Sequence, residues 1–233
     1  MITLKMAGIA IAVDNKYTFI EKLARSYLTD EEPVFTVSAS ESDIVKEREA
    51  SDAEYSQGYL ESIVVYRKIA ERLPEFDAFV FHGAVLSFEG EAYAFTAKSG
   101  VGKTTHTRNW ITQLGEKAHY LNGDKPIFRF IDGTLFACGT PYRGKEGYGV
   151  NENAPLHAIA FVNRGKENSA RKIEADEAIM KLASQVYMPS DPVSALKTLQ
   201  LIDRLSRSVK LIDLYCTPEP ESAHVSFEAM VLD

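Results

Sequence analysis

The segment AKSGVGKT at residues 97–104 constrains this chain more than any other part of its sequence. It follows an apolar run over residues 91–96 and precedes a helix-like stretch over residues 105–114, which is the order that a phosphate-binding P-loop requires. Two glycines let the backbone turn its N–H groups inward, and the start of the helix adds partial positive charge. Lys103 can reach the β- and γ-phosphates, and the Thr104 hydroxyl can bind Mg²⁺. The segment therefore predicts a polyphosphate site.

ATP with Mg²⁺ is the cofactor that this loop predicts. The residues expected to bind the nucleotide are Ser99, Gly100, Val101, Gly102, Lys103, Thr104 and Thr105. Ala97 stands where the first glycine of the usual pattern stands, and because alanine tolerates positive φ poorly, the loop must begin in an extended conformation. The alternative is a glycine-containing turn whose lysine meets only solvent.

Composition argues against several classes of partner. The 233 residues can bury one substantial core with a small appendage, and 45% hydrophobic and 25% charged residues are ordinary for a soluble globular protein. A net charge of −7 argues against a nucleic-acid surface. There is no run of eighteen apolar residues and no signal-peptide layout, so we expect a cytoplasmic protein without a membrane partner. Cys138 and Cys216 lack the spacing of a zinc site or a disulfide framework.

Residues 1–75 are expected to form a small α+β N-terminal lobe or cap. Its predicted elements are a strand at residues 9–13, a helix at 18–27, a strand at 34–37, a polar connection at 38–57 and a helix at 59–73. The last helix has apolar residues at helical spacing and ends at Pro74.

Residues 76–233 are expected to form the P-loop domain, with a mixed α/β sheet. Two pairs of strands, at residues 78–88 with 91–96 and at residues 127–131 with 134–138, are each joined by a two-residue turn that favours antiparallel neighbours. These turns are Glu89-Gly90 and Asp132-Gly133. A doubly wound sheet would have a crossover helix near the second turn, so that turn favours a largely antiparallel sheet. The chain is then expected to form a strand at residues 156–163, helices at 176–187 and 191–205, a strand at 209–215 and a closing helix at 219–230.

Asp124 is the candidate for both a metal ligand and a catalytic base. It lies 20 residues after Thr104, at the end of a predicted strand over residues 118–123 that can run beside the P-loop strand. A carboxylate next to Mg²⁺ stays ionised and can accept the proton of an attacking hydroxyl. Thr104 and Asp124 are therefore the predicted metal ligands. The alternative is an aspartate that only forms the turn Asn122-Gly123-Asp124.

Other candidate residues lie on a glycine-rich loop and at two histidines. The loop over residues 139–149 holds four of the 14 glycines and is expected to be mobile and functional. Its Arg143 and Lys145 can offset charge on a transferring phosphoryl group, or they only meet solvent. His82 is a candidate for a catalytic or phosphate-contacting role. The alternative is a core histidine whose hydrogen bonds are satisfied within the protein. His106 is expected either to face the nucleotide or to lie on the helix surface.

Four motifs in this order resemble the HPr kinase-like branch of P-loop proteins, which shares its nucleotide-binding core with phosphoenolpyruvate carboxykinase. They are HGA at residues 82–84, the P-loop with its histidine at residues 97–106, LNGDKP at residues 121–126 and GTPYRGKEG at residues 139–147. The resemblance covers residues 78–230. It implies a mixed-sheet α/β kinase core, ATP with Mg²⁺ and phosphoryl transfer to a hydroxyl. It matches Asp124 to the acidic metal-and-base position and His82 to a histidine next to the active site.

The sequence departs from that family in two respects. HPr kinase/phosphorylase has paired aspartates where this chain has Gly123-Asp124, and its glycine-rich C-terminal signature is not found here. A divergent kinase that acts on another protein, a peptide or a small hydroxyl compound is therefore favoured. A noncatalytic nucleotide-binding module and, less strongly, a carboxykinase-like enzyme are the alternatives. The acceptor and the oligomeric state are left open, a homo-oligomer included.

Overall fold

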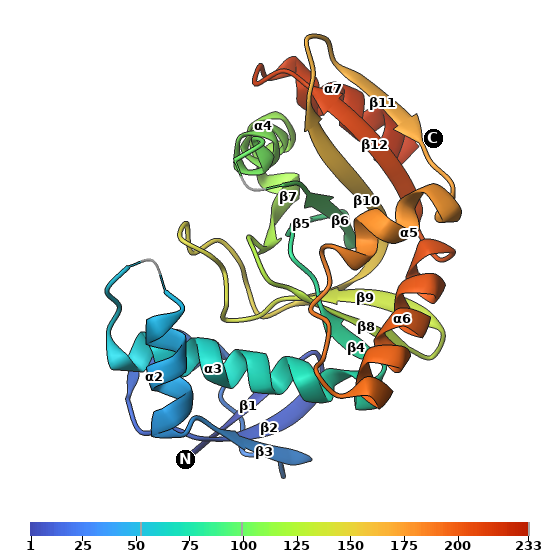
Figure 1. Cartoon of the computed structure of the whole chain (residues 1–233). Helices are drawn as coiled ribbons and strands as arrows, with labels where there is room; N and C mark the ends of the chain where they lie inside the picture. Colours follow the sequence, from blue (N-terminus) through green and yellow to red (C-terminus); the bar gives the residue numbers. More distant parts are fainter. Residues whose placement is uncertain (52, 99, 233) are drawn as a thin grey trace.

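The computed structural model describes residues 1–51, 53–98 and 100–232. Figure 1 shows a small sheet in the N-terminal lobe, defined as residues 1–75, and a long curled sheet that organises the rest of the chain. Helices pack against both sheets. The chain is therefore a mixed α/β protein, as the sequence predicts.

In the described residues of the N-terminal lobe there are three strands and three α-helices. They are β1 (Ile2–Met6), β2 (Ile9–Asp14), α1 (Phe19–Leu23), β3 (Phe35–Ser38), α2 (Glu41–Glu49) and α3 (Gln57–Arg72). Strand β2 lies in the middle, antiparallel to β1 and parallel to β3. Helix α3 buries Leu60, Val65 and Ile69 in the same apolar cluster as the strands, and its last residue precedes a 3-10 turn that contains Pro74. The α+β character of this segment is confirmed.

Helix α2 corrects the expectation of a polar connection over residues 38–57. Its start is a capping box, in which the Ser40 hydroxyl accepts from the Asp43 N–H and the Asp43 carboxylate accepts from the Ser40 N–H. Ile44 is the buried residue of this helix, so apolar periodicity could not reveal it. Ion pairs attach the helix to α3, among them Lys68 Nζ with Asp43 Oδ2 at 2.6 Å.

The curled sheet has the strand order β4-β8-β9-β10-β6-β5-β7, with β12 beside β10 and β11 beside β12. Its strands are β4 (Ala78–Val80), β5 (Ala84–Phe88), β6 (Glu91–Thr96), β7 (Ala118–Asn122), β8 (Ile127–Ile131), β9 (Thr134–Cys138), β10 (Asn153–Arg164), β11 (Ser169–Lys172) and β12 (Lys210–Cys216). Its helices are α4 (Lys103–Leu114), α5 (Ala175–Ala183), α6 (Pro192–Ser206) and α7 (Glu221–Phe227). Within the described residues, β10 pairs parallel with β6 and β12, and the sheet's other six pairings are antiparallel. The largely antiparallel mixed sheet is thus confirmed.

Both predicted hairpins are present. The turn between β5 and β6 has φ of +50° at Glu89 and +86° at Gly90, and the turn between β8 and β9 has +47° at Asp132 and +90° at Gly133. Positive φ at both central residues is the requirement of a type I′ turn. In the described chain no helix lies between β7 and β9. The turns therefore do join antiparallel neighbours in the sheet that carries the P-loop strand.

The single strand predicted over residues 78–88 is wrong, because the chain leaves one part of the sheet and enters another. β4 pairs with β8, whereas β5 pairs with β6 and β7. Gly83 lies at the break, where a Cβ would come within 2.7 Å of the Phe81 ring and 2.9 Å of the Phe95 carbonyl. Only glycine fits this close approach of two backbones.

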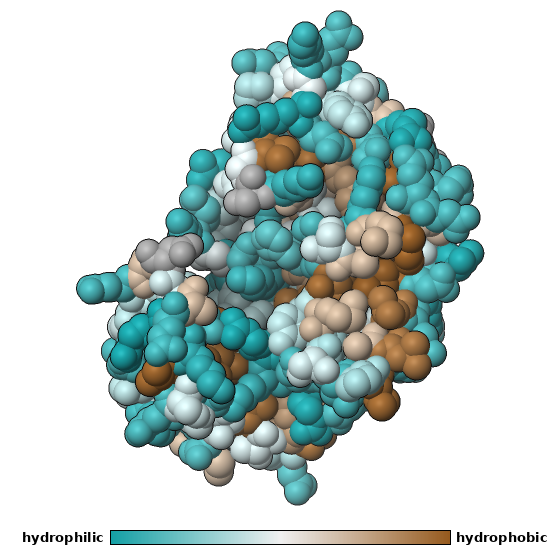
Figure 2. Space-filling view, viewed as in Figure 1, coloured by the Kyte–Doolittle hydropathy of each residue, from teal (hydrophilic) through white to brown (hydrophobic). Residues whose placement is uncertain are grey.

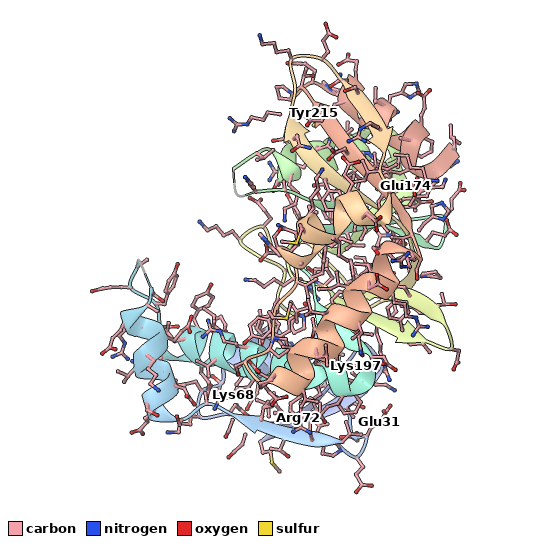
Figure 3. All side chains as sticks on the ribbon, turned by 45° about the vertical axis from the view of Figure 1, so that its right-hand side comes forward. Glu31, Lys68, Arg72, Glu174, Lys197 and Tyr215 are labelled. Carbon is pink, nitrogen blue, oxygen red and sulfur yellow. The ribbon has the colours of Figure 1, made fainter. Side chains whose placement is uncertain are left out.

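Apolar packing is continuous between the lobe and the curled sheet. The lobe's core cluster also contains Ala78, Val80 and Ile127. Figure 3 shows Lys197 on α6 close to the end of α3, and Lys197 Nζ lies 2.7 Å from Asp77 Oδ1. The division of the chain at residue 75 into two domains stays a prediction.

An apolar patch lies on the surface over the helices near the C-terminal part of the chain. Figure 2 shows brown atoms on the right-hand side, over α5 and α6, where Met180, Val193, Leu196 and Leu199 are exposed. Such a face is typical of interaction surfaces. In the described ranges, no helix has both the length and the apolar character to cross a bilayer.

Candidate active site

The predicted phosphate loop connects β6 to α4, as the sequence requires. Gly100 and Gly102 have φ of +77° and +122°, and a Cβ at either position would meet no described atom within 4 Å. The glycines are therefore needed for backbone conformation and not for space. Gly102 is the N-cap of α4, and among the described residues no side chain caps that helix. Its first N–H groups remain available to an anion. Ser99 lies outside the described residues.

Arg164, at the end of β10, holds the phosphate loop through two of its main-chain carbonyls. Its guanidinium donates to the carbonyls of Gly100 at 2.5 Å and Val101 at 3.1 Å. Because the N–H of a trans peptide points opposite to its C=O, the bond to the Val101 carbonyl turns the Gly102 N–H away from Arg164. No local sequence signal points to Arg164, because only the parallel pairing of β10 with β6 brings it to the loop.

Asp124 emerges at the same edge of the sheet as the phosphate loop. The expectation that its strand borders the P-loop strand is wrong, because β7 pairs with β5, which lies between β7 and β6. Both pairings are antiparallel, so β7 runs parallel to β6, with β5 between them. Their carboxyl ends therefore reach the same edge, which brings the predicted metal ligand close to the loop.

Lys103 and Asp124 share one electrostatic site. Burial lowers the pKa of the Lys103 ammonium below its ordinary value, the charge of Asp124 opposes that shift and Lys125 adds to it. Burial would raise the pKa of Asp124, but the hydrogen bond from His82 and the charges of Lys125 and Lys103 lower it overall. Asp124 is therefore ionised at neutral pH.

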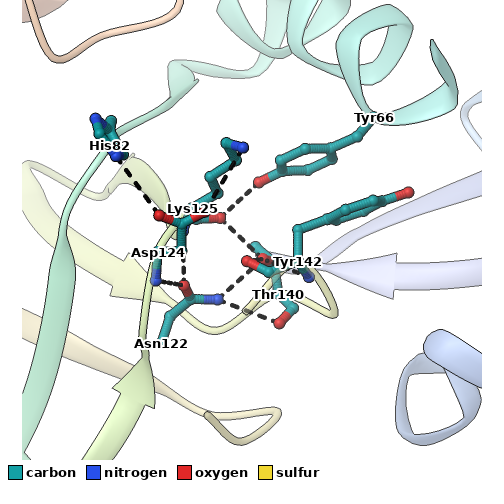
Figure 4. A network of polar contacts seen from close by, with 7 residues as sticks. All are labelled: Tyr66, His82, Asn122, Asp124, Lys125, Thr140 and Tyr142. Carbon is teal, nitrogen blue, oxygen red and sulfur yellow. Dashed lines mark hydrogen bonds and ion pairs between the residues drawn. The ribbon is translucent and has the colours of Figure 1, made fainter. Parts of the chain in front are cut away.

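The backbone at Asp124 is held by the side chain of Asn122. Figure 4 shows its amide oxygen accepting from the N–H groups of Asp124 at 2.9 Å and Lys125 at 2.8 Å. Asn122 thus forms the turn that the sequence offered as the alternative role for Asp124. The Asp124 carboxylate is left to face Lys125 Nζ, at 3.6 Å, and His82.

His82 lies next to Asp124 and is not a core histidine. Its side chain is 46% exposed, and its Nε2 lies 3.5 Å from Asp124 Oδ1. The main chain around it is fixed, since the His82 N–H donates to the Gln185 carbonyl at 2.7 Å and the Gly83 N–H donates to the Asp124 carbonyl at 2.9 Å. The Thr96 hydroxyl, at the end of the P-loop strand, donates to the His82 carbonyl at 2.9 Å. The structure therefore brings His82, Asp124 and the phosphate loop together.

The two cations of the glycine-rich loop, residues 139–149, differ in their surroundings. Arg143 is turned toward the N-terminal lobe, where its guanidinium lies 5.9 Å from the centre of the Tyr27 ring and its Nε donates to the Thr140 carbonyl at 3.4 Å. Lys145 is exposed. Among the described residues, no hydrogen bond or ion pair joins either side chain to the phosphate loop, so a role for either on a phosphoryl group stays a prediction.

The tip of the glycine-rich loop is attached to the P-loop helix. Arg108 of α4 lies 2.7 Å from Glu146 and above the Tyr148 ring, 5.9 Å from its centre. Tyr148 in turn stacks on Tyr120 of β7, with 4.6 Å between the ring centres. Since Arg108 and Glu146 are both about half exposed, this ion pair contributes little energy and can open.

His106 lies neither at the nucleotide site nor on the helix surface, so both expectations for it are wrong. It is buried between α4 and α7, with Nε2 2.8 Å from the Ser226 hydroxyl and Nδ1 3.3 Å from the Ser222 hydroxyl. The Trp110 indole also donates to Ser226, at 2.6 Å. The cluster attaches the C-terminal helix to the P-loop helix.

Acid is expected to destabilise the protein through His106. The fold lowers the pKa of this imidazole from 6.5 to about 4, because burial disfavours the charged ring. The unfolded chain therefore binds the proton first. The unfolding free energy keeps its full value with respect to His106 above pH 6.5 and falls as the pH drops toward 4. The expected loss is about 3 kcal/mol of unfolding free energy. Urea unfolding across this pH range measures it.

The matched variants for that measurement are His106→Gln and His119→Gln. The first lacks the buried titrating group and should lose much less free energy between pH 6.5 and 4. The second removes a histidine whose side chain is 47% exposed and should retain the wild-type pH dependence. An equal loss in wild type and His106→Gln would contradict the prediction.

Comparisons with protein-family models and with curated proteins gave no match. Among solved structures, the chain is similar to one described as the structure of the Hpr(Ser) kinase/phosphatase from Coxiella burnetii. The identity is 12% and the TM-score is 0.32, over 54% of this chain and 90% of that chain. At that score the likeness identifies neither a family nor a function, and the mixed α/β architecture rests on the strand pairings described above.

Proposed function

We propose that this chain is an ATP- and Mg²⁺-dependent phosphotransferase that moves the γ-phosphoryl group of ATP to a hydroxyl. The observation that carries the proposal is that the phosphate loop, Asp124 and His82 meet at one edge of the sheet, with His82 Nε2 3.5 Å from Asp124 Oδ1. Phosphoryl transfer needs mainly positioned reactants and compensation of charge. The motif resemblance favours a serine or threonine hydroxyl of a protein or peptide as the acceptor.

The donors at the site suit Mg²⁺ bound together with a nucleotide. No described group of three or more His, Cys, Asp or Glu side chains could hold a metal ion. Mg²⁺ needs no such cage, since it commonly uses one or two carboxylates, substrate phosphates and waters. The Thr104 hydroxyl and the Asp124 carboxylate would hold it. When bound, the ion offsets charge on the phosphate oxygens.

Each protein group has a distinct role in the proposed transfer. The loop N–H groups and Lys103 orient the phosphates and offset their charge. The acceptor oxygen forms a bond to the γ-phosphorus while the bond from that phosphorus to the β,γ-bridging oxygen breaks, which releases ADP. Asp124 accepts the proton of the acceptor hydroxyl. His82 helps to keep the carboxylate ionised and oriented.

A noncatalytic ATP-binding module is the second candidate, and the surroundings of Gly123 favour it. A Cβ at this position would lie 3.0 Å from the Arg143 carbonyl and 3.2 Å from the Tyr148 carbonyl. A second aspartate beside Asp124 would therefore displace the glycine-rich loop. If two carboxylates are essential for transfer, this site can only bind the nucleotide.

Incubation of the purified protein with ATP labelled in the γ-phosphate tests the proposal. With Mg²⁺ present, we expect ADP formation and labelling of a protein, peptide or small hydroxyl compound, and neither when the metal is chelated. ATP binding without turnover or labelling across a broad acceptor screen would instead support the binding module. Formation of phosphoenolpyruvate from oxaloacetate would indicate a carboxykinase-like enzyme.

Gly144→Ala is expected to slow transfer several-fold. A Cβ at this position would lie 2.9 Å from the Asp124 Cβ, and φ is +72°. The positive φ alone should lower the unfolding free energy by about 1–2 kcal/mol. Gly147→Ala is the control, because φ is +69° but a Cβ would meet no described atom within 4 Å. Both variants should lose stability in urea unfolding, Gly144→Ala at least as much as Gly147→Ala because of the added contact, and only Gly144→Ala should lose rate. Equal rates would contradict the contact with Asp124.

A further inference from the structure

Three parts of the chain meet at the peptide that follows Asp124. The Lys125 carbonyl accepts one hydrogen bond from the Tyr66 hydroxyl at 2.7 Å and another from the Thr140 hydroxyl at 2.8 Å (Figure 4). Tyr66 belongs to α3 of the N-terminal lobe, and Thr140 belongs to the glycine-rich loop. Both lone pairs of this carbonyl are therefore used, one of them by the lobe.

The network around this peptide is buried, and Asn122, Thr140 and the Lys125 carbonyl are hydrogen-bonded within it. The Asn122 amide nitrogen donates to the Thr140 carbonyl at 3.2 Å and to its hydroxyl at 3.0 Å, while the amide oxygen holds the N–H groups of Asp124 and Lys125. The Thr140 hydroxyl also accepts from the Tyr142 N–H at 3.2 Å. Asn122 and Thr140 are both fully buried. Buried hydrogen bonds of this kind favour a single geometry for the peptides they hold, whereas the buried Tyr142 hydroxyl has no partner among the described residues.

Tyr66 is placed so that its hydroxyl has little freedom. Its ring is buried and stacks on Tyr142, with 3.8 Å between the ring centres and 15° between the planes. Burial raises the pKa of Tyr66 well above its ordinary value, so the hydroxyl stays protonated and remains a donor. Other hydrogen bonds between the lobe and the rest of the chain reach other places: the Tyr27 hydroxyl donates to the Val150 carbonyl, just past the glycine-rich loop, and the Tyr187 hydroxyl donates to Glu71.

We infer that Tyr66 is a positioning residue for Asp124, and that the N-terminal lobe is thereby part of the catalytic site. The inference rests on the proposed function, because it takes Asp124 as the carboxylate that serves the metal and the acceptor. Tyr66 touches no reacting group and acts through the Lys125 carbonyl. Without it, Lys125 is held at its carbonyl by Thr140 alone, and the carboxylate one residue earlier loses part of its orientation. Displacements of about 1 Å at a catalytic group can cost about 100-fold in rate.

Tyr66→Phe tests the inference, with Tyr187→Phe as the matched control. Phenylalanine retains the stacked ring and removes only the hydroxyl. The Tyr187 hydroxyl donates to Glu71, also on α3, at 2.7 Å, so the control removes a comparable hydrogen bond between the lobe and the curled-sheet part of the chain, away from Asp124. We expect Tyr66→Phe to lower kcat about tenfold with an unchanged KM for ATP, and Tyr187→Phe to retain the wild-type kcat. Introducing 4-aminophenylalanine at position 66 restores a donor and should restore kcat.

Amide hydrogen exchange provides a readout that does not depend on activity. The N–H groups of Asp124 and Lys125 should exchange faster in Tyr66→Phe than in wild type, and Tyr187→Phe should leave them unchanged. If wild type transfers no phosphoryl group but these amides respond as expected, the positioning stands and the proposed function falls. Unchanged exchange in Tyr66→Phe, or an equal loss of kcat in both variants, would overturn the inference.

Discussion

Lys103→Ala is expected to weaken ATP binding at least about 30-fold, because removing one partner of a desolvated charge pair typically costs 2–5 kcal/mol. The ammonium is the positive side chain at the first position of α4, where the phosphates are proposed to lie. Its removal should leave the fold intact, since burial already disfavours this charge in the absence of a ligand. Titration calorimetry with ATP measures the affinity, and thermal unfolding confirms that the variant is folded.

Lys98→Ala is the matched control for that experiment. Lys98 lies in the same loop and is exposed, so its charge is screened by solvent. We expect at most a threefold change in ATP affinity for this variant, consistent with the small energies of exposed ion pairs. Wild-type affinity in a folded Lys103→Ala protein would show that residues 97–104 do not bind polyphosphate.

Features set by a few neighbouring residues could be predicted from the sequence. The turn at Asp132-Gly133 needs positive φ at two consecutive positions, and these two residue types adopt it at low cost. That turn alone excluded a crossover helix and indicated the antiparallel part of the sheet. The P-loop strand and its helix were predictable for the same reason, because glycine spacing and apolar runs are local signals.

Features set by distant pairing could not be predicted. The break before Gly83 exists because the strands on its two sides pair with different partners, which apolar content does not reveal. Strands β1 and β11 were missed for a related reason, since both are short and mostly half-buried or exposed. Helix α2 was missed because it buries little, although the spacing of Ser40 and Asp43 is a local start signal.

The residues of the candidate site also fall into two groups, those that the sequence could predict and those that it could not. Asp124, Lys103 and His82 could be named because each stands in or beside a motif, and the structure places them at one edge of the sheet. Arg164 carries no local signal, and Tyr66 resembles any aromatic residue on the buried face of an amphipathic helix. Their contacts with the site arise only when the chain folds.

Asp124→Asn should retain ATP binding and lose phosphoryl transfer. The Asn122 turn holds the main chain at residue 124 through N–H groups that the substitution leaves in place, so the fold and the loop should survive. Removing this charge also removes a repulsion toward the phosphates, so ATP affinity measured without Mg²⁺ should be unchanged or higher. Loss of a catalytic base costs about 10²–10⁴-fold in rate. The ADP formation assay described above measures that loss.

Asp132→Asn is the control that separates this effect from net charge. It changes the charge of the chain by the same amount, and asparagine tolerates the φ of +47° found at this exposed hairpin residue. It should transfer phosphate at the wild-type rate.

A metal role for Asp124 adds a second expectation. Asp124→Asn should need more Mg²⁺ to reach its residual rate, whereas Asp132→Asn should need no more than wild type. If Asp124→Asn turned over ATP as fast as Asp132→Asn, another residue would have to accept the proton, and His82, 3.5 Å from the carboxylate, is the first to replace next.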